Sequence, residues 1–201
     1  MPNNSMSTKT ETKTQAKPMR ITISGEAGSG KSTVADIIAN KLKINRYSTG
    51  DYMRTMAAAR GVTIIELNKI GETDPSIDKE LDDWQKKLEK KKGESFVLDS
   101  RLGYHFIPSS IKFFLEADIH VRAERIYHDQ RLVEENTTIK KTVENIKNRQ
   151  QLERSRYIKK YGIDYLDFST YDLVLNTTKM SPQEVAEKIV AFVKTKIQNQ
   201  K

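Results

Sequence analysis

Short apolar runs and longer stretches of helical spacing alternate along this chain. The short runs are rich in β-branched and aromatic residues, which is typical of strands. The expected strands are Arg20–Ser24 (RITIS), Arg46–Ser48, Ser95–Asp99 (SFVLD), Ile111–Leu115 (IKFFL) and Tyr171–Leu175 (YDLVL). The run at Ser95–Asp99 is apolar without alternation, which favours a parallel strand covered on both faces.

Apolar residues at helical spacing fill the intervals between the expected strands. Val34, Ile37, Ile38 and Leu42 form one such stripe after the first strand. Capping residues mark three further helix starts: Thr63 with Glu66, Asp74 before Pro75, and Ser181 before Pro182 and Glu184. A charged, largely helical stretch extends from Asp118 to about Tyr161. This alternation predicts an α/β three-layer sandwich, with a five-stranded parallel sheet, helices on both faces and a helical insertion.

The length of 201 residues suits one domain with a hydrophobic core. Residues 1–18 are polar, and we expect them to form a disordered tail ahead of a domain over residues 19–201. No run reaches the ~18 apolar residues of a transmembrane helix, and the amino-terminal arm lacks the apolar centre of a secretory signal. The chain has no cysteine, which excludes disulfides and thiolate metal sites. We therefore expect a cytoplasmic protein without a membrane partner.

The formal charge of +8 admits two interpretations. Binding of nucleic acid is one, because lysine and arginine neutralise phosphates. The other is a solvated lysine-rich surface together with a site for nucleotide phosphates. The lysines between positions 86 and 92 have few aromatic residues among them and do not repeat, so we favour the second interpretation.

A glycine-rich motif follows the first expected strand and precedes the first helical stripe. Gly25, Glu26, Ala27, Gly28, Ser29, Gly30, Lys31 and Ser32 match the pattern G-x-x-x-x-G-K-[ST]. Such a loop wraps its backbone N–H groups around phosphates, and the following helix adds its positive end. Lys31 is expected to reach the β- and γ-phosphates of ATP, and Ser32 to ligate Mg²⁺. The strand–loop–helix context predicts an ATP-binding P-loop over Gly25 to Thr33.

Further candidate residues follow from the expected sheet. Asp99 ends the central strand, so it lies at the carboxyl edge where open α/β proteins bind ligands, and it can help to place magnesium. Arg101 would point into the same crevice. The stretch from Arg122 to Arg156 is rich in arginine, which suits either an insertion that closes over phosphates or a solvated helix with paired charges, such as Arg149 with Glu153.

The order of these motifs resembles the cytidylate kinase family, especially its shorter form, from Met19 to Ile197. ITISGEAGSGKST resembles the family's opening strand and loop, and STGDYMR the element in which Thr49 and Arg54 hold the acceptor nucleotide. FVLDSRLGYHFIP is similar to the strand before the acceptor arginine, here Arg101. VRAERI is similar to the segment in which Arg122 lies by the donor adenine.

The carboxyl-terminal half continues the resemblance. RQQLERSRY is similar to the lid-side cluster of the family, which implies that Arg149, Glu153 and Arg156 bind acceptor phosphate, sugar and base. YGIDYLDFSTYDLVLNTT resembles the closing strand and adenine loop. The lid region would span about residues 127–160, with Arg131 assisting. Ser100, where the family more usually has glycine, is a departure beside the acceptor pocket.

The resemblance implies direct transfer of the γ-phosphate of Mg·ATP to CMP or dCMP by an enzyme of pyrimidine nucleotide metabolism. We expect this enzyme to be a monomer. Lys31, Arg101 and Arg149 would be the catalytic residues, with Asp99 also near the substrate. Kinases for AMP, UMP, dTMP or shikimate are alternatives within enzymes. A regulatory or nucleic-acid-binding protein that uses ATP as a switch is the alternative outside them.

Overall fold

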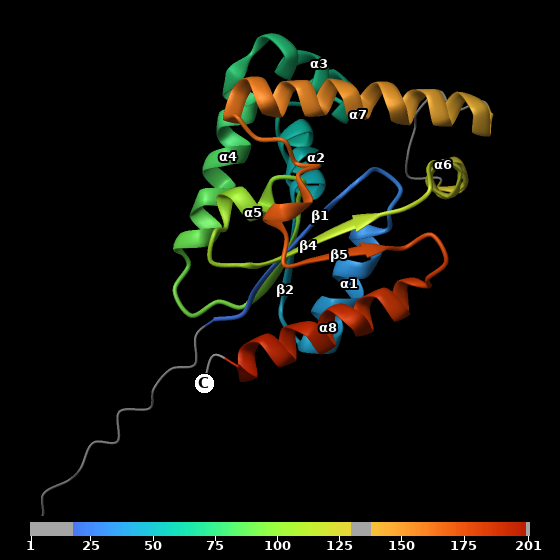
Figure 1. The fold of residues 1–201 in the computed structure, drawn as a ribbon. Helices are drawn as coiled ribbons and strands as arrows, with labels where there is room; N and C mark the ends of the chain where they lie inside the picture. The colour runs from blue at the N-terminus through green and yellow to red at the C-terminus, as the bar shows by residue number, and fades with distance from the viewer. Residues whose placement is uncertain (1–17, 130–137, 200–201) are drawn as a thin grey trace, which may run out of the picture.

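The computed structural model describes residues 18–129 and 138–199 (Figure 1). The expected disordered tail therefore lies outside the described residues except for Pro18. The same holds for Arg131 and for residues 130–137 of the expected lid.

Five strands and eight α-helices make up the described part of the chain. The strands are β1 (Arg20–Gly25), β2 (Asn45–Ser48), β3 (Phe96–Asp99), β4 (Ile111–Glu116) and β5 (Leu173–Asn176). The helices are α1 (Lys31–Leu42), α2 (Thr49–Ala59), α3 (Ile64–Thr73), α4 (Pro75–Lys90), α5 (Gly103–Phe106), α6 (Ile119–His128), α7 (Ile139–Tyr161) and α8 (Pro182–Gln198), with a 3₁₀ turn at Phe168–Thr170. The expected α/β sandwich with a five-stranded parallel sheet is confirmed.

The capping residues act as their spacing predicts. Thr63 and Glu66 form a capping box at the start of α3, and Ser181 and Glu184 form another at the start of α8. Asp74 accepts a hydrogen bond from the N–H of Ser76 ahead of α4. These contacts satisfy N–H groups that have no partner inside the helix.

The last strand begins two residues later than the apolar pattern predicts. The hydroxyl of Tyr171 donates to the carbonyl of Tyr165 at 2.8 Å, and the carboxylate of Asp172 accepts from the N–H of Lys112 at 2.7 Å. Both side chains thus fix the approach to β5 and do not extend it. Helix α5 and the 3₁₀ turn were not expected, because elements of so few residues leave no periodic pattern.

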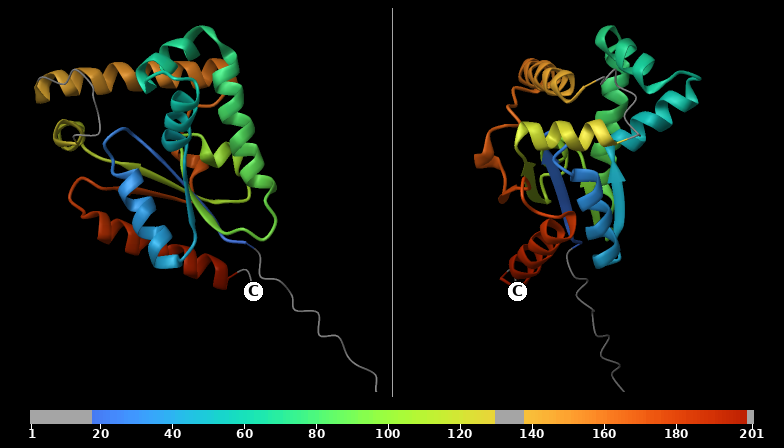
Figure 2. Two further views of the ribbon diagram at one scale, coloured as in Figure 1. Left: turned by 180° about the vertical axis from the view of Figure 1, so that it is seen from behind. Right: turned by 90° about the vertical axis from the view of Figure 1, so that its right-hand side faces the viewer.

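Helices cover both faces of the sheet (Figure 2). On one face, Ile23, Val97 and Phe113 pack under α1 and α8. On the other face, Phe114 packs against aromatic side chains of α5 and of the segment after α7, and Leu98 lies in a cluster with Leu88 of α4. Alternate residues of one strand point to opposite faces, so the sheet is buried on both sides.

The strand order places the P-loop directly after the central strand of the sheet. The order is β2-β3-β1-β4-β5, so β1 lies between β3 and β4. In this register Ile23 pairs with Asp99, and Gly25 pairs with Leu115. All five strands are parallel, and their carboxyl ends therefore meet at one edge, where open α/β sheets bind ligands. None of the helices in the described residues has the length and apolar character needed to cross a membrane.

Ile189 tests how much the cover by α8 stabilises the fold. Its side chain is fully buried against the sheet cluster, so Ile189→Ala should lower the free energy of unfolding by about 2–5 kcal/mol. Lys194→Ala, on the exposed side of the same helix, should change it by no more than about 0.5 kcal/mol. Urea unfolding followed by circular dichroism measures both. Equal stability of the two variants would contradict this packing.

Candidate active site

Glycine is required at two positions where the P-loop touches its neighbours. Gly25 has φ 145°, and a Cβ there would lie 2.2 Å from the carbonyl oxygen of Leu115. Gly28 has φ 79°, and a Cβ there would lie 2.7 Å from the carbonyl oxygen of Arg122. Positive φ is also unfavourable for other residues. The loop is therefore pressed against β4 on one side and α6 on the other.

The start of α1 is open to an anion. Gly30 is its N-cap, in the left-handed conformation and without a side-chain hydrogen bond, and the first turn has no acidic residue. The free N–H groups and the helix dipole there favour a negative ligand. Lys31 curls back over the loop, and its ammonium donates to the carbonyl of Glu26 at 2.7 Å.

The surroundings of Lys31 disfavour the charged form of its side chain. Burial, together with the nearby guanidinium of Arg101, lowers the pKa of Lys31 to about 8. Asp99 and Glu153 act in the opposite direction and offset part of this effect. An anion in contact with the ammonium would restore the pKa, because an opposite charge favours the protonated form.

Ser32 and Asp99 meet beside the loop, as expected. The Ser32 hydroxyl donates to Asp99 Oδ2 at 2.6 Å. Oxygen donors of this kind suit Mg²⁺, which takes few protein ligands and fills its sphere with phosphate and water oxygens. The pair therefore fits a Mg²⁺ ion held mainly by nucleotide phosphates. The described part of the chain contains no group of three or more His, Cys, Asp or Glu side chains that could hold a metal ion.

A carboxylate joins the two expected acceptor arginines. Glu153 Oε2 lies 2.9 Å from Arg101 Nε, and Glu153 Oε1 lies 3.0 Å from Arg149 Nε. The two arginines hold the pKa of Glu153 below its usual value against the opposing effect of burial. The structure thus brings together Arg101, Arg149 and Glu153 close to Lys31, and the carboxylate separates the positive charges of the two arginines.

Arg54 lies apart from this cluster. Its side chain is 63% exposed, and its guanidinium pairs with Asp51. Thr49, at the start of the same helix, donates to the backbone carbonyl of Asp99 at 3.4 Å. Arg46, which the sequence pattern did not single out, contacts Asp36 at 2.9 Å, Asp51 at 2.6 Å and Asp99 at 3.8 Å. Arg46 therefore places a cation next to the expected magnesium carboxylate.

Arg122 and Arg125 hold the P-loop from behind. Arg122 is 4% exposed and pairs with Glu26 at 3.2 Å. Arg125 donates to the carbonyls of Gly28 and Thr177 at 3.4 and 2.8 Å. The resemblance implies that Arg122 lies by the donor adenine, yet among the described residues it is Arg125 that lines the adjoining cleft.

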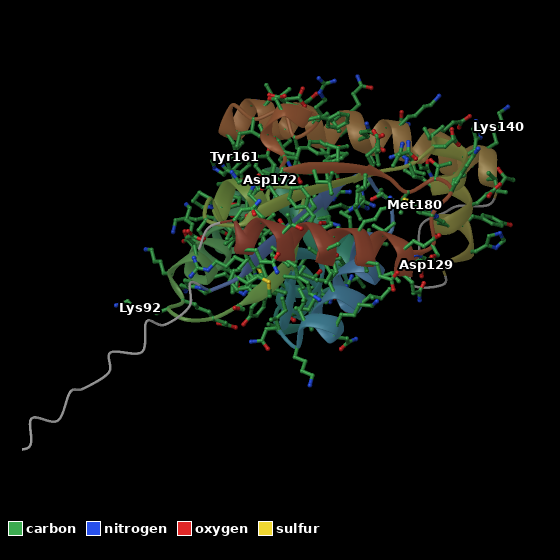
Figure 3. All side chains as sticks on the ribbon, turned by 60° about the horizontal axis from the view of Figure 1, so that its bottom comes forward. Lys92, Asp129, Lys140, Tyr161, Asp172 and Met180 are labelled. Carbon is green, nitrogen blue, oxygen red and sulfur yellow. The ribbon has the colours of Figure 1, made fainter. Side chains whose placement is uncertain are left out.

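Two cavities border these residues, and Lys31 lines the larger one while Arg101 lines the smaller one. The larger, about 900 Å³, passes over the P-loop from Met180 and Asp129 to Arg46 and Arg54. The smaller, about 60 Å³, lies between α4, the segment after β3 and the end of α7. Met180 and Asp129 lie toward the right of the view in Figure 3, and Tyr161, which lines the smaller cavity, lies toward the left. Arg101 and Arg156 line the smaller cavity.

Several residues at these cavities escaped the sequence analysis. Arg46 lies two residues before the STGDYMR motif and Asp51 lies inside it, so their position in or next to a recognised element was a usable signal. Asp82 and Gln85 line the smaller cavity, but on a helix with many charges no local pattern separates them from surface residues.

Residues 20–179 match the cytidylate kinase-like family. A cytidylate kinase of Sulfolobus acidocaldarius is 37% identical over 181 residues, which cover 89% of this chain and 96% of the relative. A cytidylate kinase of Natronomonas pharaonis is 41% identical over 180 residues, covering 87% and 89% respectively.

Solved structures share the fold at low sequence identity. An uncharacterized protein from Eubacterium ventriosum superposes with a TM-score of 0.67 at 19% identity, covering 88% of this chain and 98% of that one. Shikimate kinase from Acinetobacter baumannii, in complex with shikimate, gives a TM-score of 0.60 at 16% identity, covering 90% and 96%. At these identities the likeness shows the fold alone.

The lowered pKa of Lys31 predicts proton uptake when ATP binds. With a pKa of about 8, roughly half of the Lys31 side chains lack their proton at pH 8 and about a tenth at pH 7. Bound phosphates raise the pKa, so ATP binding should take up about half a proton at pH 8 and less at pH 7. Calorimetry in two buffers of different ionisation enthalpy measures the uptake.

Lys31→Arg is the matched control, because arginine stays protonated throughout this range. Uptake should disappear in that variant. An uptake that does not change with pH, or that persists with arginine in place, would contradict the assignment to Lys31.

Proposed function

The chain belongs to the cytidylate kinase-like family, and from this premise we infer that it transfers the γ-phosphate of ATP to CMP, and to dCMP, forming CDP or dCDP. The observation that carries the inference is the joining of Arg101 and Arg149 by Glu153, close to Lys31 and Asp99. This arrangement offers positive charge to two phosphates that meet at one point, as transfer between nucleotides requires.

The donor side uses the P-loop. Backbone N–H groups at the start of α1 and the Lys31 ammonium would hold the β- and γ-phosphates. The larger cavity, which reaches the loop from Thr177 to Pro182, would receive the rest of ATP. Ser32 and Asp99 would hold Mg²⁺, which supplies charge neutralisation at the β- and γ-phosphates.

The acceptor side uses the arginines around Glu153. Arg101 and Arg149 would bind the α-phosphate of CMP, and Glu153 keeps both guanidinium groups in place. Arg156 lines the smaller cavity and would face the nucleoside. Arg54, an exposed residue of α2 that pairs with Asp51, would turn away from Asp51 to reach the acceptor phosphate.

The reaction needs positioning more than proton transfer. An oxygen of the acceptor α-phosphate attacks the γ-phosphorus in line, the bond between that phosphorus and the β–γ bridging oxygen breaks, and ADP leaves. The attacking oxygen is already anionic, so no strong general base is required. Lys31, Arg101 and Arg149 stabilise the charge on the transferring group.

The relatives do not favour the alternative functions. Kinases for AMP, UMP, dTMP or shikimate share the P-loop, and the shikimate kinases share the fold, but the sequence relatives reported above are cytidylate kinases. Only the net positive charge of the chain supports a regulatory or nucleic-acid-binding role. A monomeric state and a cytoplasmic location stay predictions.

A panel of acceptors tests the proposed function. ADP release should accelerate with CMP and dCMP, and much less with UMP, AMP, dTMP or shikimate, because only the first two carry a cytosine next to the acceptor phosphate. A coupled assay for ADP measures this. Release that no monophosphate accelerates would overturn the assignment as a kinase, and preference for another acceptor would overturn the substrate.

Two substitutions separate the donor and acceptor sides. Lys31→Ala should lower kcat about 100-fold or more, because it removes charge from the transferring phosphate. Arg101→Ala should chiefly raise KM for CMP and lower kcat/KM by a comparable factor, with the affinity for ATP little changed. Arg154→Ala is the control, since Arg154 pairs with Asp164 away from both cavities. Equal loss of ATP affinity in the first two variants would contradict this division.

A further inference from the structure

A polar face of α4 borders the smaller cavity. Asp78, Asp82 and Gln85 are spaced i, i+4 and i+7, so they lie on one face of the helix, and all three line the cavity. Asp82 is 9% exposed and Gln85 is 2% exposed. Burying a carboxylate and an amide is unfavourable unless each finds hydrogen-bond partners. A helix that only covers the sheet would carry apolar side chains here, as Leu88 does one turn later.

One donor on this face has no partner among the described residues. The Tyr161 hydroxyl donates to both carboxylate oxygens of Asp82, at 3.0 and 2.9 Å, and the Lys160 ammonium lies 3.6 Å from Asp82 Oδ2. The Ser100 hydroxyl donates to Gln85 Oε1 at 2.7 Å. Within residues 18–129 and 138–199, nothing accepts a hydrogen bond from Gln85 Nε2. A buried amide donor and a buried carboxylate, one turn apart, therefore line the same small cavity.

The cavity adjoins the acceptor arginine. Ser100, the partner of Gln85, directly precedes Arg101, and both residues line the cavity together with Arg156. A nucleotide with its phosphate on Arg101 would direct its base toward α4. The volume of about 60 Å³ is too small for a nucleotide but suits the polar edge of a base.

We propose that Asp82 and Gln85 read the hydrogen-bonding edge of the acceptor base and select cytosine over uracil. This inference rests on the proposed function, and it identifies the residues that determine which nucleotide the kinase accepts. The Asp82 carboxylate accepts from the exocyclic N4 amino group of cytosine. The Gln85 Nε2 amide donates to N3, and its Oε1 stays fixed by Ser100.

Uracil has the opposite pattern at the same two atoms. Cytosine presents an amino donor at C4 and an unprotonated N3, whereas uracil presents the O4 oxygen and an N3–H group. In uracil, the O4 acceptor would face the Asp82 carboxylate, which is also an acceptor. The N3–H donor would face the Gln85 Nε2 amide, which is also a donor. A site whose buried polar groups are left unpaired by the wrong ligand discriminates strongly against it. Carboxylates accept from cytosine N4 in the same way in the grooves of DNA, where a good base contact gives about 1–3 kcal/mol of discrimination.

The decisive measurement is the ratio of kcat/KM for CMP to kcat/KM for UMP. This ratio does not depend on the fraction of enzyme that is folded, so partial loss of stability cannot imitate a change of specificity. Asp82→Asn keeps the shape of the side chain and an oxygen for Tyr161, but offers a donor to the base. It should lower the ratio about 10-fold or more, with KM for ATP unchanged.

Asp83→Asn is the matched control. It makes the same change one residue away, on a side chain that is 45% exposed and pairs with Lys79 and Lys86 on its own helix. Its ratio should equal that of the unmodified protein.

Gln85→Glu tests the second contact independently. It replaces the amide donor opposite N3 by a carboxylate oxygen and should also lower the ratio. The double variant with Asp82→Asn presents the complement of uracil, so it should prefer UMP to CMP.

The outcomes separate this inference from the function on which it rests. If the unmodified protein does not phosphorylate CMP, the proposed function is wrong whatever the variants do. If it does, and the ratio in Asp82→Asn and in Gln85→Glu stays at the unmodified value, the base is read elsewhere and this inference is overturned. A loss of activity on CMP and UMP in equal proportion gives that same unchanged ratio and indicates a purely structural role for α4.

Discussion

The site depends on positive charge gathered at one edge of the sheet. Lys31, Arg101 and Arg149 lie near one another, and the lowered pKa of Lys31 shows that the folded chain does not fully stabilise its ammonium. Asp99 and Glu153 offset part of the repulsion, but each also serves a second contact. Burial is the main cause of the lowered pKa of Lys31, and the Arg101 guanidinium is the second. Phosphate groups that enter this edge bring an opposite charge to the ammonium, so nucleotide binding is favoured where this charge is otherwise unfavourable.

The P-loop keeps its charged groups in place because the surrounding backbone restricts its conformation. Gly25 is pressed against β4, and Gly28 against the first turn of α6, at distances that no Cβ would permit. Behind the loop, Arg122 and Arg125 hold Glu26 and the Gly28 carbonyl. Arg122, which the resemblance assigns to the donor adenine, thus helps Arg125 to shape the loop. Preorganisation of this kind means that little rearrangement is needed when phosphates bind.

The sequence predicts features that have a local pattern, but it predicts few of the contacts that packing makes between distant residues. The P-loop, the capping boxes and the strands have signatures within a few residues, and Asp99 follows from the end of a buried strand. The bridge from Glu153 to Arg101 joins residues more than fifty positions apart, and i,i+4 spacing shows only its partner Arg149. Arg46 gains its three carboxylates from three different elements. Gln85 looks like any polar residue on a charged helix until its burial is known.

One face of α7 connects the two halves of the acceptor site. Arg149, Glu153, Arg156 and Lys160 are spaced i, i+4, i+7 and i+11, so they follow a single stripe of the helix. Arg149 and Glu153 pair with each other, and Glu153 also pairs with Arg101. Arg156 and Lys160 both pair with Asp78 of α4. In the proposed acceptor site, this stripe of α7 would therefore join the base contacts at α4 to the groups that hold Arg101.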